Sequence, residues 1–249
     1  MNWSILGWGF IGAAAVFLVV FSLLDKSKNT YDIRDFPQVE RLKASRVDAI
    51  EGGLDRTIVL GHSLFSPGYP GLGLGSLSPL PGFLDPETLA DGKMRITSSE
   101  GSLVVFARQI IEHTYQDGFS RALTPANVKS SLLGPTPLSF TTGLISTLSE
   151  SRGHGLILTG SYGPEASIWS EICMSKRGYV FASAGTIASQ AALYLHVKDL
   201  LIGENAFVLP GLISPGAGRG AGWITEDILR VLLIAMLVAG AILKLVGVL

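Results

Sequence analysis

The strongest candidate for a catalytic nucleophile is Ser63, which follows an apolar, strand-like run in the segment Gly61-His-Ser-Leu-Phe65. A nucleophile of the α/β-hydrolase type sits in a G-x-S-x-G turn, where the second glycine lets the strained turn pack on its helix. Here Phe65 replaces that glycine, and Pro67-Gly68 stops the helix that should follow. No strand-like runs precede this one to build the required sheet. The sequence therefore disfavours hydrolase chemistry, and we predict no catalytic residue.

Polar side chains also follow most of the other strand-like runs. In an open parallel sheet, ligands bind outside the carboxyl ends of the strands. The predicted ligand-binding residues at these ends are Ser63, Ser99, Ser161, Tyr162, Glu165, Thr186, Gln190, Glu204 and Asn205. Helix N-termini with serine and threonine favour an anion or a nucleotide-like group, which the two glutamates would oppose. The alternative is that Glu165 and Glu204 cap helices, because the helix dipole stabilises a carboxylate there.

Metal and cofactor sites lack their usual signatures in this sequence. The histidines are scattered, with no H-x-x-x-H or H-E-x-x-H pair. The single cysteine, Cys173, excludes an internal disulfide and a cysteine-based metal cluster, and we expect it to be a buried small apolar residue. The glycines at 71–75 and 216–222 do not have the G-x-G-x-x-G spacing of a dinucleotide fingerprint. We therefore predict no metal and no cofactor.

Short β-rich runs alternate with helical patterns through the middle of the chain. The strand-like runs are 56–61, 94–99, 128–133, 155–160, 179–184 and 199–203. The helical patterns lie at 103–116, 138–151, 165–176 and 187–195. Strands that alternate with helices of this length indicate βαβ crossovers and a parallel sheet covered on both faces. The sequence predicts a three-layer, Rossmann-like α/β domain over residues 56–213, with a mostly parallel sheet of about six strands.

Two stretches rich in proline and glycine interrupt this pattern. Residues 66–92 cannot form a continuous helix, but they also carry apolar residues. We interpret them as a surface insertion that packs on a neighbouring molecule or on the membrane. Residues 214–227 are predicted to be a flexible hinge.

Before the domain, residues 26–55 form a charged juxtamembrane segment. The apolar face of its helical second half is formed by Val39, Leu42, Val47 and Ile50.

Long apolar segments lie at both ends of the chain. Trp3 to Leu24 carries no charge, and Val231 to Leu249 carries only Lys244. A bilayer core of about 30 Å takes roughly 20 apolar residues in a helix. We therefore predict transmembrane helices within residues 1–25 and 228–249. Basic residues follow the first span and precede the second, which predicts a two-pass protein of the cell membrane with a cytoplasmic soluble domain.

The part of the chain from Gly155 onward carries a family resemblance. The strand-end segments Gly160-Ser-Tyr-Gly-Pro-Glu165, Ala184-Gly-Thr186 and Leu201-Ile-Gly-Glu204 resemble those of an uncharacterised family of membrane-anchored bacterial proteins. The family is a domain of unknown function with no assigned activity. The likeness covers most of the chain and departs at 66–92, where relatives look helical. It implies the α/β fold and the membrane topology, and it adds no reaction.

Two functions follow from these observations. With a formal net charge of −1, the chain lacks the basic face that a nucleic-acid partner would require. The first hypothesis is a non-enzymatic assembly or scaffold protein that forms a homo-oligomer through its α/β domain and its membrane helices. The absent catalytic motifs, the apolar insertion and small residues at helical spacing in both spans favour it. The alternative is a membrane-tethered small-ligand binder or enzyme that uses the strand ends. The expected partners are a second copy of the chain and the lipid bilayer.

Overall fold

The computed structural model of the 249-residue chain describes residues 16, 36–61, 75–84, 93–118, 128–150, 154–213, 229–234 and 237. Contacts divide the chain into two compact units, Phe36–Ser214 and a second unit of Met1–Asp35 with Pro215–Leu249. Within the described residues, no helix is long and apolar enough to cross a bilayer. The spans predicted at 3–24 and 231–249 lie almost entirely outside the described residues, so they stay predictions.

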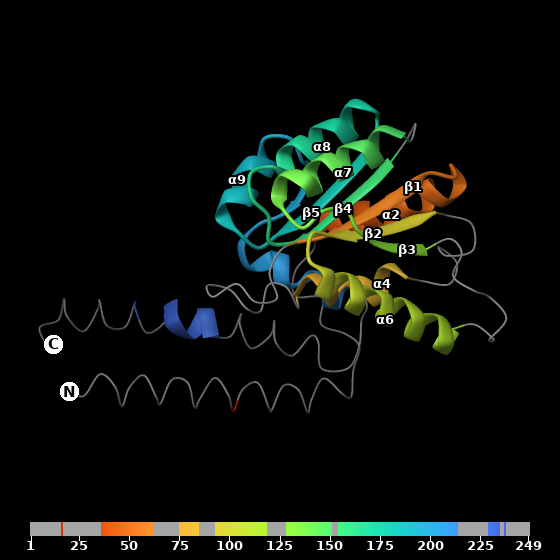
Figure 1. Ribbon diagram of the computed structural model, residues 1–249. Coiled ribbons are helices and arrows are strands. Elements are labelled where there is room, and N and C mark those ends of the chain that lie inside the picture. Colours follow the sequence, from red (N-terminus) through yellow and green to blue (C-terminus); the bar gives the residue numbers. More distant parts are fainter. Residues whose placement is uncertain are drawn as a thin grey trace, which may run out of the picture. The chain divides into compact units, whose positions relative to one another are not determined.

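A six-stranded, all-parallel sheet forms the centre of the unit Phe36–Ser214 (Figure 1). Its strands are β1 Asp55–Leu60, β2 Met94–Ser98, β3 Val128–Leu132, β4 His154–Gly160, β5 Tyr179–Ala184 and β6 Asp199–Leu201. Their order across the sheet is β3-β2-β1-β4-β5-β6. The chain therefore winds outward from β1 to one edge, returns to β4 beside β1, and winds outward to the other edge. This order is that of a doubly wound fold with its topological switch point between β1 and β4, and it confirms the predicted parallel α/β sheet.

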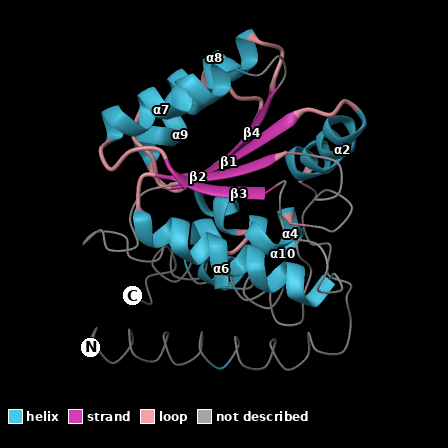
Figure 2. Cartoon of the chain, turned by 45° about the vertical axis from the view of Figure 1, so that its right-hand side comes forward, coloured by secondary structure: helices cyan, strands magenta, loops and turns pink. Residues whose placement is uncertain are grey.

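Helices cover both faces of the sheet (Figure 2). One face carries the α7–α9 layer, which consists of α7 Pro137–Glu150, α8 Ala166–Ser175 and α9 Ile187–Tyr194. The other face carries the α2–α6 layer, which consists of α2 Pro37–Glu51, α4 Leu80–Phe83, α6 Gly101–Gly118 and α10 Leu209–Ile213. A short 3₁₀ helix, η1 Gly203–Phe207, follows β6. The helices predicted between the strands are all found, with ends displaced by a residue or two.

Successive residues of the central strands feed two separate cores, because side chains alternate between the faces of a strand. Ile157 of β4 and Phe181 of β5 pack with Leu103 in the α2–α6 core. Leu156 and Leu158 of β4 pack with the helices of the α7–α9 layer. Burial on both faces explains why these strands appear in the sequence as unbroken apolar runs.

Trp169 is the centre of the α7–α9 core. Its side chain is fully buried, and its ring meets those of Phe140 and Tyr162 edge to face, at centroid distances of 5.4 and 5.8 Å. The indole Nε1 donates a hydrogen bond of 3.3 Å to the hydroxyl of Thr141. Trp169 thus joins α8, α7 and the segment that follows β4. Cys173, one turn further along α8, is buried as predicted.

Helix α2 packs on the sheet as part of the same compact unit, so the domain boundary predicted at residue 56 falls inside that unit. Its buried positions are Val39, Leu42 and Ala49. Val47 was predicted on this apolar face but is 54% exposed, so that assignment is wrong. The inward face follows the spacing 39, 42, 46 and 49, and at its third position the half-buried Arg46 donates a hydrogen bond of 3.1 Å to the Gly82 carbonyl.

The described part of the proline- and glycine-rich segment lies inside the fold. Leu77, Leu80, Phe83 and Leu84 are buried in the α2–α6 core, where α4 contacts α6 and α10. The interpretation of a surface insertion that packs on a neighbour or a membrane is therefore wrong for residues 75–84. The prolines break this stretch into short helical turns, which still bury their apolar side chains.

Candidate functional site

The carboxyl ends of β1 and β4 approach each other so closely that only glycines fit. The Gly61 amide donates a hydrogen bond of 2.8 Å to the Thr159 carbonyl, and a Cβ on Gly61 would overlap the backbone of Ser161. Gly160 has a φ of +116°, and a Cβ there would lie 2.9 Å from the Cβ of Ser76. Ligands of doubly wound proteins bind in the crevice at this switch point. Among the described residues of this protein, the backbone of 160–161 and the buried Ser76 lie close against the glycines at this point.

Two of the predicted site residues join the ends of the strands. The Tyr162 hydroxyl is buried and lies 2.5 Å from the Val59 carbonyl and 2.6 Å from the Thr159 carbonyl, which share its one proton. Burial raises the pKa of Tyr162 well above its usual value. Thr186 caps α9 by accepting a hydrogen bond from the Ser189 amide, and its hydroxyl donates to the Tyr162 carbonyl at 2.8 Å. Both hydroxyls therefore hold the two strand-end loops together.

Two further predicted residues turn back toward their own backbone. The Gln190 Nε2 donates a hydrogen bond of 2.7 Å to the Ala184 carbonyl at the end of β5. The Glu165 carboxylate accepts a hydrogen bond of 3.0 Å from the Gly163 amide and makes no capping bond to α8. These side chains organise the loops in which they lie.

The remaining predicted residues are more scattered. Ser161 is half-buried next to Tyr162, while Ser99 is buried after β2 and is separated from β4 by β1. Glu204 and Asn205 are half-buried in η1. Ser63 lies outside the described residues. The structure thus gathers Ser161, Tyr162, Thr186 and Gln190 around the ends of β4 and β5, and ligand binding by this group stays a prediction.

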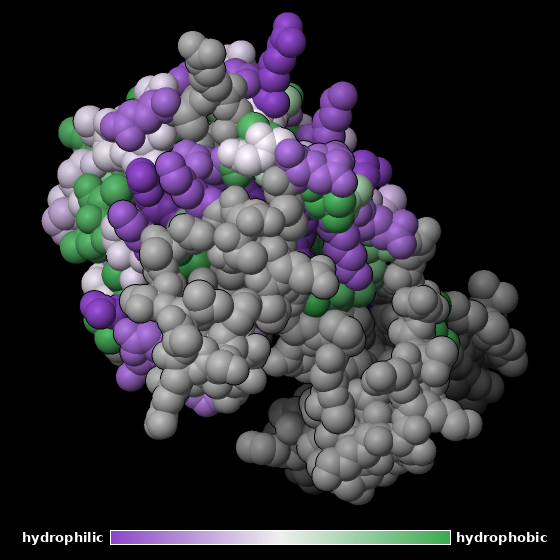
Figure 3. Space-filling view, turned by 90° about the vertical axis from the view of Figure 1, so that its right-hand side faces the viewer, coloured by the Kyte–Doolittle hydropathy of each residue, from purple (hydrophilic) through white to green (hydrophobic). Residues whose placement is uncertain are grey.

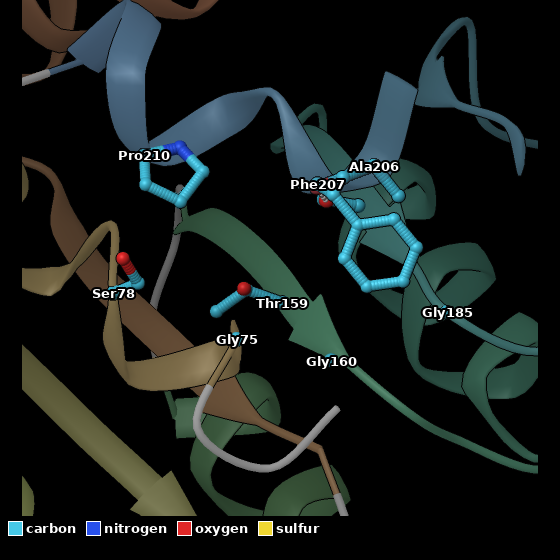
Figure 4. A pocket seen from close by; sticks show the side chains of 9 residues that line it. Gly75, Ser78, Thr159, Gly160, Gly185, Ala206, Phe207 and Pro210 are labelled. Atoms are coloured by element: carbon cyan, nitrogen blue, oxygen red, sulfur yellow. Dashed lines mark hydrogen bonds between the residues drawn. The ribbon is translucent and has the colours of Figure 1, made fainter. Parts of the chain in front are cut away.

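A cavity of about 170 Å³ lies on the α2–α6 side of these strand ends (Figure 4). Its walls come from β4, β5, η1, α10 and the turn before α4. The lining residues are Gly75, Ser78, Thr159, Gly160, Ser183, Gly185, Ala206, Phe207 and Pro210. None of the predicted site residues that the structure describes is among them, and none of these described lining residues carries a charge.

The two strand residues of this cavity could have been found from the strand pattern. Thr159 and Ser183 stand two positions after Ile157 and Phe181, so all four side chains point to the same face of the sheet. In each apolar strand the hydroxyl residue interrupts this face just before the carboxyl end. The sequence prediction selected the polar residues that follow the strands. It overlooked Thr159 and Ser183, which are the last residues of β4 and β5 that face this side of the sheet. The contribution of Ser78 depends on tertiary packing and has no local signal.

The described walls of the cavity are chemically plain. Among the described lining residues there is no histidine, cysteine, lysine or carboxylate that could act as acid, base or nucleophile. Pockets for nucleotides and drug-sized ligands span about 300–1,000 Å³, so this cavity is too small for a dinucleotide. Within the described ranges, no three side chains of histidine, cysteine, aspartate or glutamate gather as metal ligands.

A second polar cluster lies at the opposite, amino ends of the strands. The Arg41 Nε is 2.6 Å from the Asp199 carboxylate, and the buried Tyr179 hydroxyl lies beside Asp199 and Ser45 without a hydrogen bond of good geometry. Burial raises the pKa of Tyr179, and the negative charge of Asp199 raises it further. Burial and the nearby Arg46 lower the pKa of Arg56 to about 10. Of these interactions, the ion pair between Arg41 and Asp199 attaches α2 to the edge strand β6.

The fold defines a doubly wound, Rossmann-like α/β domain whose sequence lacks the glycine-rich fingerprint of a dinucleotide-binding protein. Comparisons with protein-family models, with curated proteins and with solved structures found no match for this chain. The resemblance to a membrane-anchored bacterial family therefore stays an expectation from the sequence. The features of this chain that can indicate its function are therefore its exposed surface and the cavity at the ends of β4 and β5.

Proposed function

We propose that this chain is a membrane-anchored assembly protein whose copies associate through the outer face of the α7–α9 layer. The observation that carries the proposal is the surface of α9. This helix contains no charged residue, and Ile187, Tyr194 and the adjoining Leu195 are 86%, 69% and 78% exposed. Scattered apolar residues on a surface need no explanation, but a continuous apolar patch marks an interaction site.

The exposed residues of α9 form a row along one side of the helix. Ile187, Ala191 and Tyr194 follow the spacing i, i+4 and i+7, which places them one above another. The opposite side of the same helix is buried through Ser189 and Leu193. A helix that is apolar on both sides is typical of an element that is covered on both sides. The sheet covers one side of α9, so we infer that a partner covers the other.

The patch continues over the neighbouring helices. Leu138 in the first turn of α7 and Ile168 in the first turn of α8 are exposed, and α8 packs between α7 and α9. Helix α7 has a single charge, Glu150, at its last residue. Figure 3 shows, on one face of the described part of the chain, green hydrophobic residues lying among purple hydrophilic ones.

We assign this face to a second copy of the chain. Helix α9, at the centre of this face, carries no charge and offers nothing to a charged partner, whereas two identical apolar helix surfaces are complementary across a two-fold axis. The predicted membrane spans support the same partner, because copies anchored in one bilayer meet at a raised effective concentration. The described helical residues 229–234, at the start of the second predicted span, expose Val231, Leu233 and Ile234.

The mass of the detergent-solubilised full chain tests the proposal. Light scattering should give a protein mass that is a multiple of 26.4 kDa for the wild type. The double variant Ile187→Lys with Leu195→Lys should give the single mass, because each buried lysine would lose its hydration. The control is Val105→Lys on α6, which adds a charge to an exposed valine of the α2–α6 layer and should leave the oligomer intact. A wild type that stays monomeric at micromolar concentration contradicts the proposal.

The membrane arrangement has its own test. We propose that the α/β domain faces the cytoplasm, since basic residues concentrate after the first predicted span. A cysteine at Ser27 should resist an impermeant thiol reagent in intact cells and react after permeabilisation. The native Cys173 adds little background because it is buried. Full labelling in intact cells would show that the α/β domain lies on the outer side of the membrane, which contradicts the proposed orientation.

A further inference from the structure

We propose that the cavity at the carboxyl ends of β4 and β5 binds a small neutral molecule that carries hydroxyl groups. This site lies on the other side of the sheet from the α7–α9 layer, and its occupation does not depend on the assembly role. The inference rests on one buried side chain, on the character of the walls and on the size of the cavity.

The buried side chain is Thr159. It is 3% exposed, and it projects from β4 toward the turn that carries Gly75 and Ser78, with Pro210 nearby (Figure 4). Its hydroxyl makes no hydrogen bond with any described residue, whereas Ser183 on the next strand donates to the Ala206 carbonyl at 2.8 Å. Thr159 lines the cavity, so its hydroxyl is available to a molecule inside it. A ligand with a hydroxyl of its own would form the hydrogen bond that no described residue provides.

The walls favour a neutral ligand over an ion. Ser78 supplies a second hydroxyl, and Ala206, Phe207 and Pro210 supply apolar surface. A carboxylate, phosphate or ammonium group would lose its hydration here without meeting an opposite charge. One end of such a ligand would therefore carry hydroxyl groups that face Thr159, and the other end would be a carbon framework that faces Phe207.

The size of the cavity limits the ligand to a small one. An apolar cavity of about 150 Å³ in another protein holds one benzene molecule, and this cavity has about 170 Å³. Glycerol and similar short polyols fit within this volume. The proposed class is thus a free polyol or the polyol end of a larger headgroup.

Gly75 offers a way to close the cavity. A Cβ built on Gly75 meets no heavy atom within 4 Å, although this residue lines the cavity. A Gly75→Leu substitution therefore places its Cβ without a clash against any described atom, and we expect the rest of its side chain to occupy the cavity. In contrast, Gly160 cannot be used as a test, since its φ of +116° strains any other residue.

The test follows the methyl signal of Ala206, which lines the cavity, in the full chain labelled at alanine methyl groups. Glycerol is the main probe, with inorganic phosphate and benzene as the charged and the apolar comparison. We expect a saturable shift with glycerol, which Thr159→Val weakens about two- to tenfold through one lost hydrogen bond. Gly75→Leu should abolish it. The matched control is Thr97→Val, because Thr97 is fully buried with an unbonded hydroxyl but does not line the cavity.

Three outcomes would overturn the inference. A shift that never saturates, or that survives in Gly75→Leu, shows an adventitious additive only. Binding of benzene or phosphate in preference to glycerol assigns the cavity to another ligand class. An equal loss of affinity in Thr159→Val and Thr97→Val shows a general loss of packing. Vesicles whose lipids carry glycerol headgroups distinguish a lipid ligand from a free polyol. If the ligand is the headgroup, these vesicles should shift the Ala206 signal at a far lower concentration than free glycerol does. None of these results bears on the oligomer mass, so the two proposals fail separately.

Discussion

The two helical layers of this domain bury similar cores but present different surfaces to solvent. Helix α2 of the α2–α6 layer carries six charged residues in the sequence PQVERLKASRVDAIE, and α6 forms an exposed ion pair between Arg108 and Glu112. Helix α9 of the α7–α9 layer carries none. Inside, the layers match, with Phe83 and Leu103 on one side and Trp169 and Phe140 on the other, all almost fully buried.

This difference separates what folding requires from what association requires. A helix needs only one apolar side to dock on its own sheet. Helix α2 has one such side, and its other side is charged. The second apolar side of α9 adds nothing to the core of the monomer. This outer side of α9 is removed from water only when another surface covers it. The outer surface of the α7–α9 layer is therefore the part of the domain that indicates association.

The largest expected effect tests the claim that the two cores are equally well packed. Trp169→Ala and Phe83→Ala should each lower the free energy of unfolding by about 3–5 kcal/mol, because each leaves a large cavity. Chemical denaturation of the two variants beside the wild type measures this. If Trp169→Ala costs less than about 1 kcal/mol while Phe83→Ala costs the full amount, the α7–α9 layer is not an independent core and the comparison fails.

A pair of tyrosines sharpens the comparison at the level of a single hydroxyl. Tyr162→Phe should cost about 1–2 kcal/mol, since it removes a buried hydrogen bond to the ends of β1 and β4. Tyr179→Phe on the α2–α6 side should cost close to nothing, because its hydroxyl has no hydrogen bond of good geometry to lose. Both variants keep the ring. Equal losses of stability would show that Tyr179 is bonded to Asp199 in solution.

The smallest effect concerns pH and Cys173. Burial raises the pKa of this thiol to about 12, whereas the unfolded thiol ionises near pH 9. The folded state therefore binds the proton more tightly, so stability is unaffected below pH 9 and falls as pH rises toward 12. The loss due to this group should reach about 1 kcal/mol near pH 10. In Cys173→Ala the fall of unfolding free energy between pH 8 and 10 should be shallower by this amount, and an unchanged slope would contradict the burial of the thiol.

Much of the fold could be predicted from the sequence. Parallel strands buried on both faces form unbroken apolar runs, such as 155–160 and 179–184, and the helices between them have regular spacing. The face of α2 was harder to predict because a half-buried arginine, Arg46, interrupts it. The hydrogen bond from Arg46 to the Gly82 carbonyl lets this long polar side chain lie on the inward side of the helix, where an apolar residue would be expected.

The candidate site was predicted less well, for a physical reason. Residues directly after a strand, such as Thr186 and Gln190, lie next to exposed carbonyls and amides, and their side chains satisfy these first. The cavity instead uses Thr159 and Ser183 from within the strands, and closes over them with Ser78 from a segment distant in sequence. Only tertiary packing brings these three residues together.

The most direct test of the assembly role is cross-linking in native membranes. Single cysteines at Ile187 or Leu195, in a Cys173→Ser background, should join two copies through a short bismaleimide, because both positions lie in the proposed interface. A cysteine at Val105 of the α2–α6 layer should give far less cross-linked product. The account predicts a band at twice the mass of the chain for the α9 positions alone. Equal cross-linking from Val105, or none from either α9 position, would contradict it.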